Sequence, residues 1–285
     1  MVHALGLGEF QVGRSHECDY PPQVLTLPIC TTPVFDIHCD AREIDRRVKE
    51  TLATAESVYQ VFDDVLERLR PTHIVTQTQC KVCAVSLDDV ERALSARFST
   101  RPEVVAMEPN SLQEIYNDIF RLARACAVEQ RGQQLVASIK AEMDEISSVA
   151  KATGRRPRVI NVEWQEPLMA AGNWIPELTE MLGAHNLFGT AGQHSPWMTW
   201  EEMAAADPDV VICMPCGYDL KRTREEMHWQ DWSKLRAQVY LADGNQYLNR
   251  PGPRVAASLR ILAEILYPES FAPSLEGIGW ERFSS

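Results

Sequence analysis

The chain has 285 residues, of which 28 are Lys or Arg and 40 are Asp or Glu, so its formal net charge is −12. This balance argues against a nucleic-acid or anionic-membrane surface, because both require a basic face to displace counterions. Hydrophobic residues make up 45% and charged residues 24%, as in folded globular proteins and unlike disordered chains. At about 100–200 residues per domain, the length fits one large domain or two lobes.

The start of the chain lacks the features of a secretory signal. Residues 1–22 have no basic region followed by a long apolar run. No stretch approaches the roughly 18–20 consecutive apolar residues of a membrane span. As written, the sequence predicts a protein that is not membrane-embedded and is cytoplasmic. A periplasmic or extracellular location would require a different N-terminus.

Short apolar strands and helices are predicted to alternate in the first part of the chain. Ile44, Val48 and Leu52 fall on one helical face, whereas residues 73–77 form a short run with β-branched residues that is typical of a strand. In chain order the predicted elements are a strand end at 12–15, a helix from 40, a helix through 65–69, a strand at 73–77, a helix capped by Ser86 and a strand at 103–107. The short connections point to a mostly parallel sheet.

Residues 111–152 interrupt this alternation with helical spacing alone. One apolar stripe contains Ile115, Ile119 and Leu122, and a second runs from Leu135 to Ile146. The stretch predicts a short helix followed by a long one. The alternative is two ordinary helices within one domain, but a bridge is favoured because a second strand–helix series follows directly.

The second series completes the predicted architecture. Its elements are a strand at 158–162, a helix at 176–182 closed by Gly183, a helix at 200–206 capped by Thr199, strands at 209–213 and 239–242, and a final helix opened by Pro253. We therefore predict an α/β fold with two Rossmann-like lobes, residues 1–110 and 153–285, joined by a helical bridge over residues 111–152.

Thiols, aromatic residues and amides recur where predicted strands end. They occupy residues 15–20, 78–83, 163–164, 172–174, 215–218 and 243–250. Ligands of open parallel sheets bind beyond the carboxyl ends of the strands, where loops and helix N-termini converge. The pattern therefore predicts a ligand cleft between the two lobes.

Three segments carry a resemblance to a known family. They are Gly13-Arg14-Ser15-His16-Glu17-Cys18-Asp19-Tyr20-Pro21-Pro22, Pro71-Thr72-His73-Ile74-Val75-Thr76-Gln77, and the stretch from Asp243 to Arg254 that ends Arg250-Pro251-Gly252-Pro253-Arg254. Together they resemble the cobalamin-binding, helical-backbone class of ABC-importer solute-binding proteins, in its signal-less, cysteine-containing subgroup.

This resemblance implies two Rossmann-like lobes, a rigid interlobe helix and a corrinoid held by aromatic contacts. By position, Tyr247 matches an aromatic residue that packs on the ligand, and Glu17 stands where the periplasmic cobalamin binder has an aromatic. Gly172 and Asn173 match a loop on the ligand side. The family normally begins with a strand before the segment equivalent to residues 2–8, so the first strand of the N-terminal lobe is expected to be missing.

Four of the eight cysteines are candidate metal ligands. Cys80 and Cys83 form a Cys-x-x-Cys pair, and Cys18 and Cys216 follow other predicted strands. With His16 and Glu17 they can hold Zn, an Fe–S cluster or cobalt. The alternative is that they are uncoordinated thiols packed at the lobe interface. Cys126 and Cys213 are expected in the core.

The remaining candidates suit a flat macrocycle with polar edges. Trp164, Trp174, Tyr218 and Tyr247 are predicted to supply aromatic contact. Asn249 and Arg250 are predicted to contact polar ligand groups, although Arg250 can equally cap its own loop. His16 can ligate a metal as a neutral imidazole or be an ordinary hydrogen-bonded loop residue.

Four other tryptophans are assigned to packing. Trp197 and Trp200 are expected to staple a helix start, and Trp229 and Trp232 to cover the core.

No sequence pattern supports catalysis. The chain has no Gly-x-Ser-x-Gly elbow, phosphate-binding loop or dinucleotide fingerprint. We therefore predict a non-catalytic protein that holds a corrinoid or related metal chelate, with an ABC permease as its partner. The alternatives are a metal or Fe–S protein that uses the cysteines directly, and a thiol-redox enzyme that uses Cys80 and Cys83.

Overall fold

The computed structural model describes residues 1–37, 39–54, 58–77 and 101–284, which divide into two compact units. Unit 1 contains Met1–Pro109 and Tyr116–Leu135, and unit 2 contains Asn110–Ile115 and Val136–Ser285. Cys80, Cys83 and the helix predicted from Ser86 lie outside the described residues. The boundaries of the helical bridge, placed after residues 110 and 152, remain predictions from the sequence.

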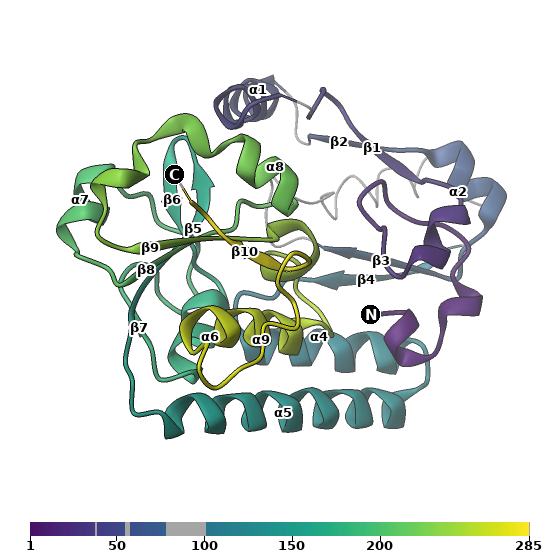
Figure 1. Ribbon diagram of the computed structural model, residues 1–285. Helices are drawn as coiled ribbons and strands as arrows, with labels where there is room; N and C mark the ends of the chain where they lie inside the picture. The colour runs from purple at the N-terminus through teal and green to yellow at the C-terminus, as the bar shows by residue number, and fades with distance from the viewer. Residues whose placement is uncertain (38, 55–57, 78–100, 285) are drawn as a thin grey trace. The chain divides into compact units, whose positions relative to one another are not determined.

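The described residues of unit 1 form two small sheets. Its elements are η1 (His3–Leu5), η2 (Gly8–Phe10), η3 (Pro22–Thr26), β1 (Thr31–Pro33), α1 (Ala41–Thr54), β2 (Tyr59–Val61), α2 (Asp63–Leu69), β3 (His73–Gln77) and β4 (Glu103–Met107). Strands β1 and β2 pair antiparallel, and β3 and β4 pair in parallel (Figure 1). His73 lies opposite Glu103. The strands predicted at 73–77 and 103–107 are therefore confirmed.

The strand end predicted at 12–15 is wrong. Only one parallel bridge forms there, between Arg14 and Ile29. The Arg14 N–H donates to the Pro28 carbonyl, and the Cys30 N–H donates back to Arg14. The ladder cannot continue toward Val12, because the next donor would be the nitrogen of Pro28, which carries no hydrogen.

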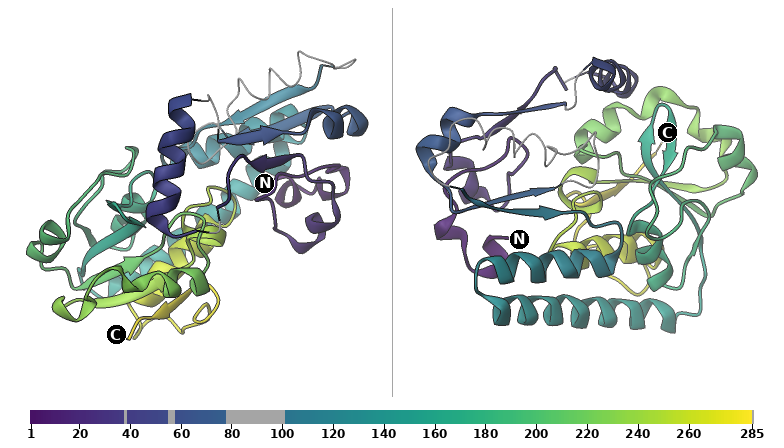
Figure 2. Two further views of the ribbon diagram at one scale, coloured as in Figure 1. Left: turned by 90° about the horizontal axis from the view of Figure 1, so that it is seen from above. Right: turned by 180° about the vertical axis from the view of Figure 1, so that it is seen from behind.

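Two successive helices, α4 (Leu112–Ala125) and α5 (Glu129–Ala152), confirm the predicted short-then-long pair. Ile115, Ile119 and Leu122 of α4 are fully buried, as their spacing predicts. The 24 residues of α5 form one continuous helix (Figure 2, right) of about 36 Å. Both helices contribute residues to the two units.

Unit 2 is built on a six-stranded sheet in the order β10-β9-β8-β5-β6, with β7 also on β5 (Figure 1). Its elements are β5 (Arg158–Gln165), β6 (Leu168–Ala170), α6 (Ile175–Met181), β7 (His185–Asn186), α7 (Trp200–Ala205), β8 (Val210–Cys213), α8 (Leu220–Glu225), η4 (Met227–Trp229), η5 (Trp232–Lys234), β9 (Gln238–Ala242), η6 (Gly244–Leu248), α9 (Val255–Leu266) and β10 (Trp280–Arg282). Strands β5, β7, β8 and β9 are parallel, whereas β6 and β10 are antiparallel.

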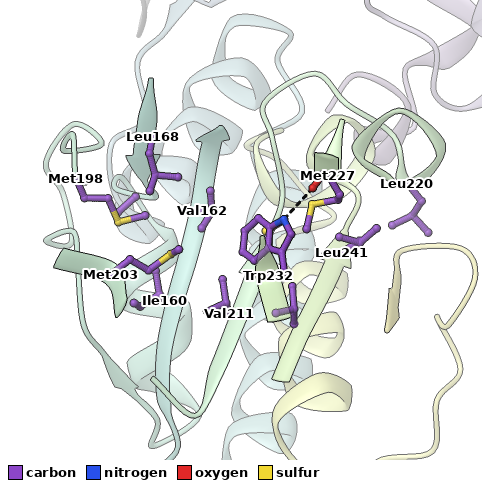
Figure 3. Packing of buried hydrophobic residues seen from close by; sticks show 13 residues of the cluster. Ile160, Val162, Leu168, Met198, Met203, Val211, Leu220, Met227, Trp232 and Leu241 are labelled. Atoms are coloured by element: carbon purple, nitrogen blue, oxygen red, sulfur yellow. Dashed lines mark hydrogen bonds between the residues drawn. The ribbon is translucent and has the colours of Figure 1, made fainter. Parts of the chain in front are cut away.

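Alternate residues of β5 pack on opposite faces of this sheet. Ile160 and Val162 join a buried cluster in which the Trp232 Nε1 donates to the Met227 carbonyl at 2.9 Å (Figure 3). On the other face, the Asn161 amide donates to Thr179 of α6 at 3.0 Å. This alternation is the period of two expected of a strand.

The four tryptophans assigned to packing have different environments. Trp232 belongs to the buried cluster and the half-buried Trp229 packs against it, so both cover the core as predicted. The ring of Trp200 packs edge-to-face against both. Trp197, by contrast, is 59% exposed, so the predicted staple is wrong for this residue. Thr199 caps α7 as predicted, within a capping box completed by Glu202.

The C-terminal segment is held by a buried carboxylate. Glu264, 1% exposed in α9, accepts hydrogen bonds from Arg260, Ser274, the Leu275 N–H and the Trp280 indole at 2.5–3.0 Å. Burial raises the pKa of Glu264, but the hydrogen bonds outweigh burial and hold this pKa below its usual value. The ionised carboxylate therefore anchors the chain between α9 and β10.

Candidate functional site

The carboxyl ends of three neighbouring parallel strands, β5, β8 and β9, lie at one edge of the unit 2 sheet. Polar and aromatic residues follow β8 and β9, as the sequence pattern predicts, whereas residues 163–164 lie in the last part of β5, which continues to Gln165. We refer to residues 163–164, 172–173, 193–195, 214–218 and 243–250 as the unit 2 rim.

Trp164 is a half-buried aromatic residue of this rim with a fixed orientation. Its Nε1 donates to the Glu166 carbonyl at 3.1 Å, and its ring packs edge-on against Tyr218 with centroids 5.5 Å apart. The Arg222 guanidinium lies over the Tyr218 ring, 3.9 Å from its centroid. Tyr218 is only 2% exposed, so in this structure it supports Trp164 and offers almost no surface of its own.

Trp174 is also buried, at 4% exposure, and its Nε1 donates to the Leu248 carbonyl at 3.1 Å. The structure therefore gives Trp174 a packing role between the start of α6 and η6. Its side chain exposes almost no surface that could make the predicted contact with a ligand.

Two loops of the rim are locked together by Ser195. Its hydroxyl donates to the Glu163 carboxylate at 2.8 Å and accepts from the Gly172 N–H at 3.0 Å. A Cβ on Gly172 would lie 2.5 Å from the Gln193 carbonyl oxygen, so only glycine fits. Asn173, with φ of +54°, accepts from the Gly192 N–H through its backbone carbonyl. This packing holds Asn173 in place at the rim.

The segment after β9 forms a single π-helical turn, η6, which carries Tyr247. Asp243 caps it by accepting from the Gln246 N–H at 2.5 Å. Asn249 donates to the Met214 carbonyl at 2.7 Å, which ties the segment to the end of β8. Arg250 donates to the Asn245 side chain at 2.7 Å, consistent with the loop-holding alternative for this residue. Such π-turns are frequent at functional sites.

Asp243 is 5% exposed, and burial raises its pKa to about 6. The hydrogen bond from Gln246 opposes this rise, the charge of Asp219 adds to it, and the charge of Arg250 opposes it. The carboxyl group that caps η6 thus titrates close to neutral pH.

In unit 1 the predicted residues His16, Glu17 and Cys18 lie in a loop organised by Arg14. The Arg14 guanidinium donates to the carbonyls of residues 15, 16 and 18 at 3.2–3.4 Å. The His16 Nδ1 lies 2.8 Å from the Thr31 hydroxyl, and its ring packs on Tyr59 at 5.2 Å. Burial and the Arg14 charge lower the pKa of His16, against a hydrogen bond with Thr31, which favours the neutral imidazole.

The cysteine site stays a prediction. Cys18 in unit 1 and Cys216 in unit 2 are half-buried free thiols, and Cys80 and Cys83 lie outside the described residues. Within the described ranges, no group of three or more His, Cys, Asp and Glu residues could hold a metal ion. Cys213 is fully buried, as predicted, and burial raises the pKa of its thiol. Cys126, also expected in the core, is only half-buried.

Several rim residues were missing from the predicted site. Glu163 was seen only as a neighbour of Trp164, and Ser195 lies in a loop with no recognisable motif. The Asp243-Gly244-Asn245 sequence directly after a strand was a usable signal for a capped turn. Thr31, by contrast, contacts His16 across 15 positions of the chain, so no local pattern could have revealed it.

This arrangement, an α/β fold with a long helical backbone and a polar–aromatic rim beyond parallel strands, is that of a ligand-binding protein. A family model described as "Periplasmic binding protein" matches residues 59–237, more than half of the chain. The chain therefore belongs to the periplasmic binding protein family.

A curated relative and several solved structures agree with this placement. An uncharacterized ABC transporter substrate-binding lipoprotein, YvrC of Bacillus subtilis (strain 168), is 22% identical over 277 residues, covering 95% of this chain and 77% of the relative. A periplasmic heme binding protein from Pseudomonas aeruginosa matches with a TM-score of 0.71 and 18% identity over 100% of this chain and 94% of its own.

Two further structures match in the same way. The periplasmic heme-binding protein RhuT from Roseiflexus sp. RS-1 matches with a TM-score of 0.66 and 19% identity, covering 94% of each chain. The vitamin B12 binding protein BtuF of Vibrio cholerae matches with a TM-score of 0.62 and 18% identity over 92% of this chain and 90% of its own.

The predicted fold and the predicted class are thus confirmed. The protein is a non-catalytic substrate-binding protein of the ABC transporter type with the helical-backbone fold. In the part of the chain that the structure describes, no helix combines the length and the apolar character needed to cross a membrane.

Proposed function

We propose that this protein binds a corrinoid and presents it to an ABC permease. The fold neighbours described above are named for binding heme or vitamin B12, and both of those ligands are metal-bearing tetrapyrrole-type macrocycles. The location of the ligand between two lobes, and the location of the protein in the cell, stay predictions from the sequence.

The aromatic residues of the unit 2 rim support a flat ligand. Trp164 and Tyr247 are half-buried and come from the ends of β5 and β9. The ring of Trp164 is oriented by its hydrogen bond and by Tyr218, whereas the Arg254 guanidinium lies 5.1 Å from the centroid of the Tyr247 ring. Rings held in this way lose little conformational entropy when a macrocycle packs on them.

The polar composition of the rim favours a corrinoid over haem, and this observation carries the proposal. A corrin ring has neutral amides around its edge, whereas haem carries two carboxylates. The half-buried residues of the rim include amide side chains at Asn173, Asn245 and Asn249 and a carboxylate at Glu163. Amides and carboxylates accept hydrogen bonds from ligand amides, and the Glu163 carboxylate would repel the carboxylates of haem.

Arg250 of the rim and the nearby Arg254 are engaged within unit 2 and do not form a carboxylate clamp. Arg250 donates to Asn245, and Arg254 donates to Gln246 at 2.8 Å beside the Tyr247 ring. Bidentate arginine–carboxylate pairing is the usual way to hold such a ligand group. The engagement of both arginines is a second reason to prefer the neutral corrin edge.

The first test is anaerobic purification, followed by a visible spectrum and metal analysis. Corrin absorption bands, or tight titration with aquocobalamin, would support the proposal. Bound Zn or Fe without affinity for aquocobalamin would contradict it and would favour a protein that uses its cysteines directly.

The second test uses two tryptophan variants of unit 2. Trp164→Ala should weaken aquocobalamin binding by about tenfold or more, because truncating a buried aromatic anchor costs more than about 1–2 kcal/mol. Trp197→Ala is the matched control, since Trp197 is 59% exposed and lies outside the defined rim. Equal losses in the two variants would remove Trp164 from the site.

A further inference from the structure

We infer that Glu163 and Asn173 form a subsite for one peripheral propionamide of the bound corrinoid, with Ser195 as the residue that positions the carboxylate. This inference rests on the proposed function and narrows its ligand class. Corrinoids in which this ring carboxylate has already been converted to an amide are accepted, and those that keep the free acid are rejected. All three residues belong to unit 2, and Glu163 and Asn173 are half-buried, so both retain exposed surface.

The direction of the Glu163 side chain is set by an irregularity in β5. Val162 and Trp164 pair with adjacent residues of β6, so the Glu163 between them is one extra residue on its strand. Bulges of this kind re-aim a side chain and are over-represented next to active sites. The Glu163 carbonyl also accepts from the Cys216 N–H at 3.1 Å. The carboxylate therefore leaves the strand from a backbone that is held in place.

Ser195 holds this carboxylate in one orientation. The Gly172 N–H donates to the Ser195 Oγ at 3.0 Å, so the hydroxyl proton is left for the Glu163 Oε2, which lies 2.8 Å away. A hydrogen bond donated to a carboxylate is stronger than one between neutral groups, and Ser195 is only 4% exposed. One buried hydroxyl thus joins the carboxylate to the backbone of the residue before Asn173.

Asn173 has a fixed backbone and an uncommitted side chain. Its N–H donates to the Gln193 carbonyl at 2.7 Å, and its carbonyl accepts from the Gly192 N–H at 2.9 Å. Its φ of +54° lies in the left-handed region, which asparagine adopts more readily than most residues. Among the described residues, no group forms a hydrogen bond with the side-chain amide of Asn173. This amide is therefore available to a ligand.

The two side chains match the donors and the acceptor of a primary amide. An ionised carboxylate only accepts hydrogen bonds, whereas an asparagine amide both donates and accepts. The NH₂ group of the ligand amide donates to Glu163, and its carbonyl accepts from Asn173. A ligand carboxylate has no proton to donate at neutral pH and brings a like charge beside Glu163, which disfavours binding. We choose a propionamide because its longer arm reaches a half-buried pair more easily than an acetamide does.

The test compares cyanocobalamin with its separated monocarboxylic acids, in each of which one propionamide is hydrolysed to a propionate. Cyanide and the nucleotide base occupy both axial positions of the cobalt, so the new carboxylate does not bind the metal. We expect at least one of these acids to bind the full chain about tenfold or more weakly than cyanocobalamin at pH 7. Acids whose carboxylate lies elsewhere on the ring should bind nearly as tightly as cyanocobalamin.

Variants assign this difference to the subsite. Glu163→Gln should bring the weak acid within about threefold of cyanocobalamin, because the like charge is gone. Glu201→Gln is the matched control, since it removes the same charge from an exposed residue of α7 outside the rim, and it should keep the tenfold difference. Ser195→Ala should reduce the ratio of the two affinities, whereas a role of Ser195 in stability alone would leave this ratio unchanged.

A further variant tests the amide partner. Asn173→Gly removes the side chain and keeps the backbone conformation, because glycine adopts a positive φ readily. It should weaken the binding of cyanocobalamin by about 3–10-fold through the lost hydrogen bond. Unchanged binding of cyanocobalamin by this variant would contradict the role of Asn173 in the subsite.

The outcomes separate this inference from the proposed function. If the wild type binds cyanocobalamin and all of its monocarboxylic acids equally tightly, the subsite is wrong and the proposed function stands. If one acid binds weakly and Glu163→Gln leaves that deficit unchanged, another group rejects the acid and the inference is also wrong. If the wild type binds neither cyanocobalamin nor any of the acids, both fail together.

Discussion

Asp243 should make the stability of unit 2 depend on pH in a direction opposite to that of most carboxylates. Its pKa is about 6 in the folded protein, against 3.8 for the unperturbed group, because burial disfavours the charged form. Between these two values the folded state holds a proton that the unfolded state has lost. The free energy of unfolding contributed by Asp243 therefore falls as pH rises from about 4 to about 6.

The size of the effect follows from the shift of the pKa. Each unit is worth about 1.4 kcal/mol, so a shift of roughly two units corresponds to about 3 kcal/mol. Asp243→Asn removes the titration and keeps an oxygen that can accept from the Gln246 N–H. As the pH rises from 4 to 7, the free energy of unfolding of the variant should increase by up to about 3 kcal/mol relative to that of the wild type.

Urea unfolding followed by tryptophan emission measures this difference in unit 2 alone. All seven tryptophans, at positions 164, 174, 197, 200, 229, 232 and 280, belong to unit 2. Asp219→Asn is a useful companion, because it removes a charge that raises the pKa of Asp243 and should reduce the pH dependence in part. Parallel stability profiles for the wild type and Asp243→Asn across this pH range would refute the reasoning.

Two further substitutions in unit 2 have expected results. Glu264→Gln should lower the free energy of unfolding by about 2–3 kcal/mol in the same urea assay. Four donors lose a charged acceptor, and the new amide group faces the Trp280 indole N–H. A decrease below about 0.5 kcal/mol would contradict the anchoring role of Glu264. Gly172→Ala should lower the free energy of unfolding by about 1–3 kcal/mol and weaken corrinoid binding, because the added Cβ would lie 2.5 Å from the Gln193 carbonyl oxygen. Unchanged binding would show that the loop carrying Asn173 is not part of the site.

Long periodic segments were predictable from the sequence because each carries its own signal. The helical stripes of α4 and α5 and the apolar runs of β5, β8 and β9 all appear where they were expected. Strands β6, β7 and β10 have only two or three residues and exist because a distant strand pairs with them. The failed strand at 12–15 shows the same dependence, since the missing donor belongs to Pro28.

The unit 2 rim was predictable in location but not in detail. Loops after parallel strands meet at one edge whatever their composition, which is why Trp164 and Tyr247 could be placed at a rim. Trp174 and Tyr218 have the same chemistry but are buried, and they contact residues far away in the sequence, Leu248 of η6 for Trp174 and Trp164 for Tyr218. Burial of one aromatic and exposure of another depend on tertiary packing, which residue type and spacing do not encode locally.

The central claim is that the unit 2 rim selects a neutral, amide-edged macrocycle over one that carries carboxylates. The most direct measurement is the pair of dissociation constants for aquocobalamin and hemin, obtained by titration of the same purified full chain at one pH and one ionic strength. The account predicts that aquocobalamin binds at least tenfold more tightly than hemin, and that Glu163→Gln narrows this ratio. Tighter binding of hemin, with no measurable affinity for aquocobalamin, would contradict it.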